Sequence, residues 1–162
     1  MSGRPDGPLE IRRRIVALEP LGEGAMGEVF SATDPDSGQR LALKLLRPEL
    51  ASDERAVERF REEAELTAAV DCAGGLPVYG AGQSPDGRPF YVMKRVEGRT
   101  LRALLDERGR RVTDLLWRQR LLAIFADICE TVAYAHARGV VHRDLKPDNV
   151  LVDEHDSVTV ID

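Results

Sequence analysis

The stretch His142-Arg143-Asp144-Leu145-Lys146-Pro147-Asp148-Asn149 decides the fold class of this 162-residue chain. Three polar side chains of different chemistry stand at fixed spacing within it: a carboxylate at Asp144, a cation two residues later at Lys146 and an amide at Asn149. Valine- and leucine-rich segments flank the stretch on both sides. The pattern predicts a polar loop held at each end by short apolar segments, a setting in which functional residues are often found.

The composition bounds the classes of function. The chain has the length of one ordinary domain, and its 43% of hydrophobic residues is enough for a packed core. Its net charge of −5 gives no electrostatic footprint for a nucleic acid or an anionic membrane surface, so neither partner is expected. Lysine is rare: it occurs only at Lys44, Lys94 and Lys146.

The two cysteines, Cys72 and Cys129, do not form a disulfide framework. No run approaches the ~18 apolar residues of a membrane span, and residues 1–8 lack the apolar region of a signal peptide. We therefore expect a cytoplasmic segment. Cys129 is expected to be buried, because it continues a helical apolar stripe. The other members of that stripe are Leu121, Phe125, Ile128 and Val132.

Hydrophobic periodicity predicts an α+β fold. Residues 1–13 read as a disordered tail, because they are rich in Gly, Pro and charge. Residues 14–97 then alternate strands and turns around one helix, and residues 98–162 are mostly helical. The predicted strands of the first part are 15–21, 28–33, 40–46, 76–81 and 89–96, and a short strand at 157–161 ends the second.

The helix of the first part is expected to begin after Ser52 or Asp53, either of which can cap its N-terminus. Two further helices are expected over residues 100–107 and 115–138, the second ended by Gly139. The buried face of the first helix is predicted from 3.6-residue spacing. Its members are Val57, Phe60, Ala64 and either Thr67 or Ala68.

A glycine-rich motif, Gly22-x-Gly24-x-x-Gly27-x-Val29, separates the first two predicted strands. No helix follows it, which distinguishes it from the dinucleotide-binding fingerprint. Such glycines allow the backbone to approach phosphates and to donate N–H groups to them. Taken alone, the motif fits a glycine-rich hairpin turn equally well.

Lys44 lies in the third predicted strand, on the face opposite Leu43. Alone it reads as an exposed strand lysine. Its spacing from Glu63 in the predicted helix suits a pair between a strand lysine and a helix glutamate. Glu62 is an adjacent alternative partner, and Glu63 also fits an i,i+4 surface pair within the helix.

From about Ile15 to Asp162 the chain resembles the eukaryotic-type serine/threonine protein kinases of bacteria. The glycine-rich motif, the strand lysine, the helix glutamate, the polar loop and a terminal Asp occur in the order and spacing of that family. The resemblance implies a small lobe, with a five-stranded antiparallel sheet and one helix, over residues 14–97. It implies the incomplete start of a helical large lobe over residues 98–162, with ATP bound between the two.

The resemblance implies a nucleotide site in which the three glycines cover the ATP phosphates and Lys44, held by Glu63, grips the α- and β-phosphates. Met93 would be the gatekeeper. Two residues depart from the family, which often has Glu-Tyr where this chain has Lys94-Arg95. Main-chain groups make the adenine contacts there, so ATP binding is still expected. The adenine contacts implied are Val29 and Ala42 above the ring, Leu151 below it, and the backbone of Lys94 and Val96.

In the polar loop, the resemblance makes Asp144 the catalytic base and makes Lys146 a cation that offsets charge on the phosphoryl group. Asn149 and Asp162 would hold Mg²⁺. Leu145-Lys146-Pro147 points to Ser or Thr of protein substrates. His142 would be structural, and Arg143 beside the base is typical of kinases controlled by activation-loop phosphorylation.

No Phe-Gly follows Asp162, so we expect a chain truncated at the metal-binding Asp. The complete parent protein, which could be membrane-anchored, is expected to transfer phosphoryl groups to Ser/Thr of proteins. The 162-residue chain alone is expected to be inactive and prone to associate. Two alternatives are a kinase remnant that binds nucleotide or a partner without catalysis, and a small-molecule phosphotransferase, which usually lacks Leu-Lys-Pro after the Asp.

Overall fold

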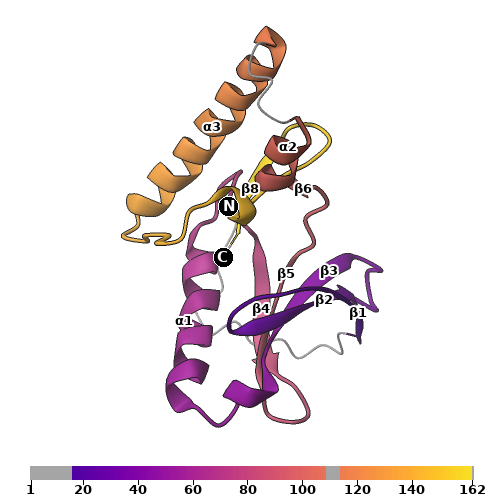
Figure 1. Ribbon diagram of the computed structural model, residues 1–162. Helices are drawn as coiled ribbons and strands as arrows, with labels where there is room; N and C mark the ends of the chain where they lie inside the picture. Colours follow the sequence, from indigo (N-terminus) through magenta and orange to yellow (C-terminus); the bar gives the residue numbers. More distant parts are fainter. Residues whose placement is uncertain (1–15, 109–113, 162) are drawn as a thin grey trace. The chain divides into compact units, whose positions relative to one another are not determined.

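A computed structural model of the protein describes residues 16–108 and 114–161 (Figure 1). The chain divides into two compact units. Residues up to Ala64, together with Val78–Arg95, form the first unit, and Glu65–Pro77 with the chain from Val96 form the second. The predicted tail over residues 1–13 lies outside the described residues.

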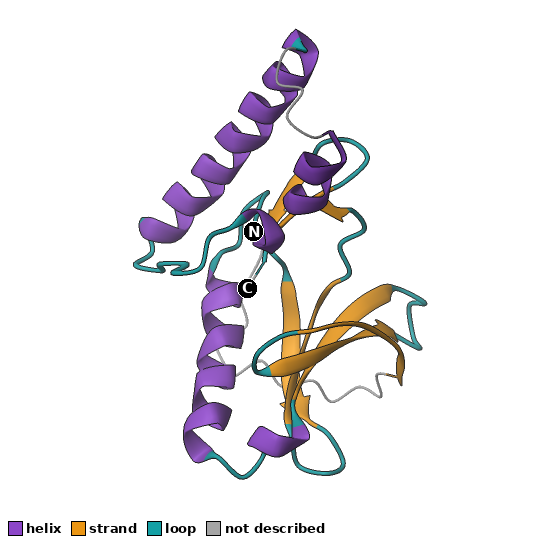
Figure 2. Cartoon of the chain, viewed as in Figure 1, coloured by secondary structure: helices purple, strands orange, loops and turns teal. Residues whose placement is uncertain are grey.

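The first unit contains a five-stranded antiparallel sheet (Figure 2). This confirms the small-lobe sheet predicted from the sequence. Strand β3 has the predicted bounds, and each end of the other strands lies within two residues of its predicted position. In spatial order the strands are β1 (Val16–Glu23), β2 (Gly27–Thr33), β3 (Arg40–Leu46), β5 (Pro89–Lys94) and β4 (Val78–Gln83).

The two faces of this sheet have different side chains. Directly opposed residues of an antiparallel pair point to the same face, and successive residues alternate. Lys44 pairs with Val29 on β2 and with Tyr91 on β5, and Ala42 pairs with Met93, so these five side chains share one face. An apolar cluster occupies the alternate positions: Ala32, Leu41, Leu43 and Val92, with Phe30, Leu45 and Phe90 packed against them.

Helix α1 (Glu54–Ala69) follows a single 3₁₀ turn, η1 (Pro48–Leu50). Asp53 Oδ1 accepts hydrogen bonds from the N–H groups of Arg55 and Ala56, so Asp53, one of the two predicted capping residues, caps the helix. The predicted buried face is confirmed at Phe60 and Ala64 and includes Ala56 as well.

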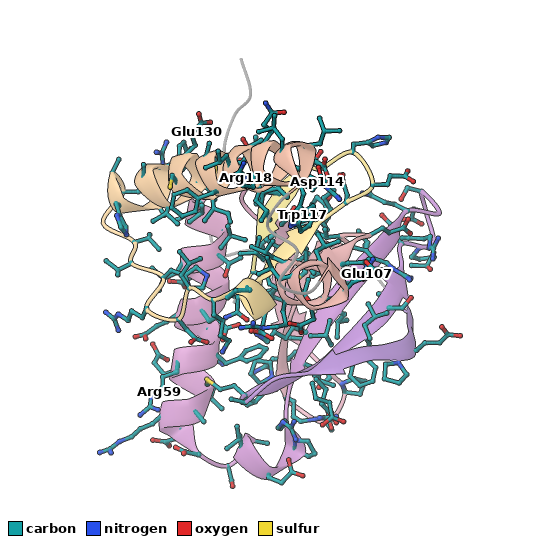
Figure 3. The ribbon with its side chains drawn as sticks, turned by 45° about the horizontal axis from the view of Figure 1, so that its top comes forward. Arg59, Glu107, Asp114, Trp117, Arg118 and Glu130 are labelled. Atoms are coloured by element: carbon teal, nitrogen blue, oxygen red, sulfur yellow. The ribbon has the colours of Figure 1, made fainter. Side chains whose placement is uncertain are left out.

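The second unit combines helices α2 (Leu101–Arg108) and α3 (Leu115–His136) with a small sheet of order β6 (Arg99–Thr100), β7 (Val150–Val152) and β8 (Val158–Val160). The sequence did not predict β6, since two residues carry no periodic signal. Asp114 caps α3 by accepting from the N–H groups of Leu116 and Trp117 (Figure 3). The core consists of Leu104, Trp117, Ile124, Ile128, Val150, Val152 and Val158.

The prediction that Cys129 is buried was wrong: it is a free, exposed cysteine. Leu122 and Phe125, on the same side of α3, are 67% and 62% exposed. Apolar residues occur around most of α3, so their spacing fits more than one helical stripe. The predicted stripe, which includes Cys129, is not the buried one. The stripe that is buried consists of Trp117, Ile124, Ile128, Thr131 and Ala135.

A tight loop of the second unit lies between α3 and β8. The carbonyl oxygen of Gly74 accepts a 2.9 Å hydrogen bond from the N–H of Val160. A Cβ on Gly74 would lie 1.9 Å from Oγ1 of Thr131, and a Cβ on Gly75 would lie 2.0 Å from the carbonyl oxygen of Val70. Only glycine fits at both positions. The predicted strand 76–81 therefore begins two residues late, because Leu76 and Pro77 belong to this loop.

Among the helices of the described residues, none combines the length and the apolar character that crossing a bilayer requires.

Candidate functional site

The glycine-rich turn joins β1 to β2 and is closed by a hydrogen bond from the N–H of Gly24 to the carbonyl oxygen of Gly27 (2.8 Å). Arg47, just after β3, contacts the turn at three points. Its N–H donates to the carbonyl oxygen of Met26 (3.0 Å), and its Nε donates to that of Gly24 (2.9 Å). Its Nη2 forms an ion pair with Glu23 Oε2 at 3.1 Å. One arginine thus holds the tip of the turn.

The space around the glycines of this motif differs from one glycine to the next. A Cβ on Gly27 would lie 3.0 Å from the carbonyl oxygen of Leu45, 3.1 Å from Cγ of Lys44 and 3.2 Å from the ring of Phe60. Packing within the protein therefore favours glycine at position 27, because a Cβ there would press on these neighbours. A Cβ on Gly22 would meet nothing within 4 Å, so packing within the described residues does not account for a glycine there.

Lys44 forms the ion pair that its spacing predicts. Its Nζ lies 2.6 Å from Oε1 of Glu63, and the lysine is 4% exposed. Glu62, the alternative partner, occupies the preceding helical position and is exposed. A buried ammonium needs a compensating carboxylate, and Glu63 supplies it. Glu63 is therefore more than a member of an intrahelical surface pair.

Tyr91 adds a third member to this cluster. Its hydroxyl donates to the same oxygen, Oε1 of Glu63, over 2.7 Å. Its ring lies 5.4 Å from that of Phe60, at an interplanar angle of 50°. Sequence reasoning missed Tyr91, although strand alternation from Met93 would have placed it on the face of the sheet that carries Lys44.

The other predicted adenine-site residues divide between the two units. Val29, Ala42 and Met93 lie on the Lys44 face of the sheet in the first unit, as its register shows. Lys94 ends β5 with an exposed side chain, which leaves its backbone as the group of interest. Val96, which follows β5, and Leu151, which lies in β7, belong to the second unit and are half-buried there.

Asp144, Lys146 and Asn149 converge in the second unit. Lys146 Nζ donates to Oδ2 of Asp144 at 2.6 Å, and Asn149 Nδ2 donates to the same oxygen at 3.1 Å and to the Asp144 carbonyl oxygen at 3.0 Å. The hydrogen bond from Lys146 is the main cause that holds the pKa of Asp144 below its ordinary value. Neither side-chain bond uses Oδ1 of Asp144, which can therefore accept a further hydrogen bond.

Asn149 offers one oxygen atom of the kind that binds a hard cation. The residue is buried, in the 3₁₀ turn η2 (Pro147–Asn149), and both of its side-chain hydrogen bonds run through Nδ2. Its amide oxygen, Oδ1, is the atom that Mg²⁺ prefers. The N–H of Ile161 donates to its carbonyl oxygen at 2.9 Å, which ties the turn to the chain just before Asp162. Asp162 itself lies outside the described residues.

His142 and Arg143 shape the start of the loop. His142 is half-buried, with Nε2 3.2 Å from the carbonyl oxygen of Ile161, while its buried Nδ1 has no partner among the described residues. Arg143 has a φ of 65°, a left-handed conformation that is strained for a residue with a side chain. This strained residue directly precedes Asp144, a position at which functional sites often store strain.

The chain belongs to the protein kinase domain family, which matches residues 15–162. The serine/threonine-protein kinase PknD of Chlamydia caviae is 36% identical over 156 residues, which make up 93% of this chain and 17% of the relative. PknD of Protochlamydia amoebophila is 35% identical over 152 residues, covering 90% of this chain and 15% of the relative. These matches confirm the family resemblance drawn from the motifs.

Solved structures agree with the sequence matches. The crystal structure of the Mycobacterium tuberculosis PknI kinase domain aligns with a TM-score of 0.73 at 31% identity, covering 91% of this chain and 58% of that one. The predicted kinase fold is therefore confirmed. The chain spans 17% or less of the two curated relatives named above, and a little over half of the PknI chain.

Proposed function

We propose that the complete parent protein is a serine/threonine protein kinase that uses ATP and Mg²⁺. The observation that carries the proposal is the ion pair between buried Lys44 and partly buried Glu63. Taking these charges out of water costs about as much as their attraction returns, so such a pair is poorly explained as a folding device. It is well explained as a device that aims an ammonium group at the α- and β-phosphates of ATP.

The nucleotide site in this proposal uses mostly backbone and apolar groups. Main-chain groups of Lys94 and Val96 bond the adenine edge, with Met93 as the gatekeeper. The open space around Gly22 suits a backbone that approaches a phosphate closely. The other contacts are Gly24 and Gly27 over the phosphates, and Val29, Ala42 and Leu151 around the adenine ring.

Transfer of the phosphoryl group centres on Asp144. A substrate hydroxyl donates a hydrogen bond to Oδ1 of Asp144. The hydroxyl oxygen then bonds to the γ-phosphorus of ATP, and the bond between that phosphorus and the bridging β-phosphate oxygen breaks. The hydroxyl proton passes to the carboxylate, and ADP leaves. Lys146, 2.6 Å from the other carboxylate oxygen, offsets negative charge on the group in transfer. The lowered pKa of Asp144 keeps this base ionised.

Asn149, through Oδ1, and Asp162 would hold Mg²⁺, which when bound neutralises charge on the phosphates. Leu145-Lys146-Pro147 and the names of the curated relatives support Ser or Thr of a protein as the acceptor. We place this segment in the cytoplasm, where ATP is found, and its free cysteines fit a reducing compartment.

The test measures MgATP affinity and phosphate transfer to a basic protein substrate for the complete parent protein and three variants of it. Lys44→Met and Asp144→Asn should each lower transfer by orders of magnitude, because both act on the transition state. Lys44→Met should also weaken ATP binding, while Asp144→Asn should not. Arg59→Ala, on the exposed outer side of α1, is the matched control and should change neither quantity (Figure 3).

Transfer that survives Asp144→Asn would refute the assigned base. MgATP binding without any transfer would instead support the reading of a nucleotide-binding protein that lacks catalysis.

A further inference from the structure

Tyr91 contacts the Lys44–Glu63 pair in a way that its place in the sheet explains. It stands directly opposite Lys44 in the β3–β5 register, so both side chains leave the same face. Tyr91 is 2% exposed, and its hydroxyl donates to Oε1 of Glu63 at 2.7 Å. Lys44 Nζ donates to the same oxygen at 2.6 Å. One carboxylate oxygen therefore accepts from two donors that are neighbours on the sheet.

The two donors differ in stiffness. Lysine has a flexible stem with four rotatable bonds, whereas a tyrosine ring has two, so the buried hydroxyl of Tyr91 is a fixed reference point on β5. The side chain of Glu63 is 27% exposed, against 6% for that of Lys44, so water can reach the carboxylate and compete for it. A fixed second donor opposes that competition.

The ring of Tyr91 is fixed as well. Phe60, three residues before Glu63 on α1, contacts it with ring centroids 5.4 Å apart. Because residues three apart lie on one side of a helix, Phe60 and Glu63 form neighbouring contacts to the same tyrosine. The tyrosine therefore joins this part of α1 to β5 through one apolar and one polar contact, both within the first unit.

We propose that Tyr91 is a positioning residue that keeps Glu63 on Lys44, so that the ammonium group is aimed before nucleotide binds. The proposal rests on the function proposed above. It assigns to a hydroxyl group on β5 the task of keeping α1 in register with the phosphate-binding lysine.

Tyr91→Phe is the sharpest test, because it retains the buried ring and removes only the hydroxyl. A hydrogen bond to a charged group supports an expected loss of on the order of tenfold in MgATP affinity and in kcat/KM for ATP. Adenosine carries no phosphates and does not need Lys44, so its affinity should stay the same. A purely structural defect would weaken both ligands. Tyr79→Phe, an exposed tyrosine on β4, is the control and should leave ATP affinity within about twofold.

A double-mutant cycle with Glu63→Gln locates the effect. If Tyr91 acts through the carboxylate, Tyr91→Phe should cost little in the Glu63→Gln background, so the two losses will not add. Equal losses for ATP and adenosine, additive losses in the cycle, or an unchanged ATP affinity for Tyr91→Phe would each overturn the proposal. The ATP affinity of Lys44→Met is measured in parallel. An unchanged affinity in Lys44→Met would refute the proposed nucleotide site itself. A loss of affinity in Lys44→Met without a loss in Tyr91→Phe would refute only the role of Tyr91.

Discussion

Arg47 Nε donates a 2.9 Å hydrogen bond to the carbonyl oxygen of Gly24, from the end of β3 to the tip of the glycine-rich turn. Together with the backbone bond to Met26 and the ion pair with Glu23, it holds the turn through contacts within the protein itself. A turn that is ordered in advance loses less entropy when it closes over phosphates. The side chain of Arg47 is therefore part of how the turn would bind nucleotide.

Arg47→Ala should loosen the turn and weaken MgATP binding severalfold, because the carbonyl oxygen of Gly24 and the carboxylate of Glu23 lose their shared donor. Arg47→Lys should behave almost as badly, since one ammonium cannot reproduce the fork of a guanidinium. Amide hydrogen exchange over residues 22–26 and ATP titration measure the two effects. Unchanged exchange in Arg47→Ala would show that the turn is held by its backbone alone.

Glu63→Gln should reduce phosphate transfer by at least an order of magnitude, whereas Glu62→Gln should change it little. Glu63 Oε1 accepts from both Lys44 and Tyr91, while Glu62, one residue earlier in α1, is exposed. Two neighbouring glutamates of equal charge thus serve as each other's control. The measurement compares kcat/KM for ATP between the two variants. A larger loss for Glu62→Gln than for Glu63→Gln would assign the partner of Lys44 to Glu62.

Lys146→Met should raise the pKa of Asp144 towards its ordinary value, because the hydrogen bond from Lys146 is the main cause of its lowering. A base must be ionised to take a proton. Its depressed pKa keeps it ionised as the pH falls, and activity is lost only when the pH passes through that value. In Lys146→Met the acid limb of the kcat profile should therefore move to higher pH. Carboxyl NMR titration of Asp144 gives the same comparison without catalysis, and an unmoved titration would contradict the assigned cause.

Gly74→Ala should destabilise the protein by ~2–4 kcal/mol, because the new Cβ would overlap Oγ1 of a buried Thr131 and force the backbone to shift. Thermal or urea unfolding measures the change. Thr131→Ala added to this variant removes the overlapping atom and should restore part of the loss. Gly22→Ala is the control: nothing lies within 4 Å of its Cβ position, so it should not destabilise the fold.

Adjacent residues of α3 test which face is buried. Ile128 is 7% exposed and belongs to the core, so Ile128→Ala should cost ~2–4 kcal/mol of unfolding free energy. Cys129 is exposed, and Cys129→Ala should change stability by no more than ~0.5 kcal/mol. Reaction with a thiol reagent under native conditions checks the same point, since the exposed thiol should react without unfolding. Similar losses of unfolding free energy for Ile128→Ala and Cys129→Ala would show that Cys129 is buried, as the sequence predicted.

The sequence was sufficient wherever a signal is local and periodic. Alternation fixed β3 and the face of Lys44, and the distance along the chain to Glu63 identified its partner, because strand and helix geometry leave few positions in reach. Alternation was insufficient for α3. A helix with apolar residues on most sides gives no strong stripe, and burial there depends on which neighbours pack against it.

Long-range contacts without a periodic pattern could not be predicted. The bonds of Arg47 depend on how β3 ends beside the turn before β2, and β6 exists only because Arg99 and Thr100 meet β7 some fifty positions later. Tyr91 lies between these cases: its face could be predicted from strand alternation, but its hydrogen bond to α1 could not.

Strand β3 has an implication for how this protein can change in evolution. Lys44 and Ala42 point to one side of the sheet, while Leu41 and Leu43 point to the apolar cluster on the other. A one-codon insertion within the strand would exchange the two sets, sending leucines to the phosphate side and the ammonium group into the core. Catalytic and folding defects would thus appear in the same clone. The turn at residues 34–39 carries no such alternation, so in-frame insertions and deletions should survive there while β3 remains free of them.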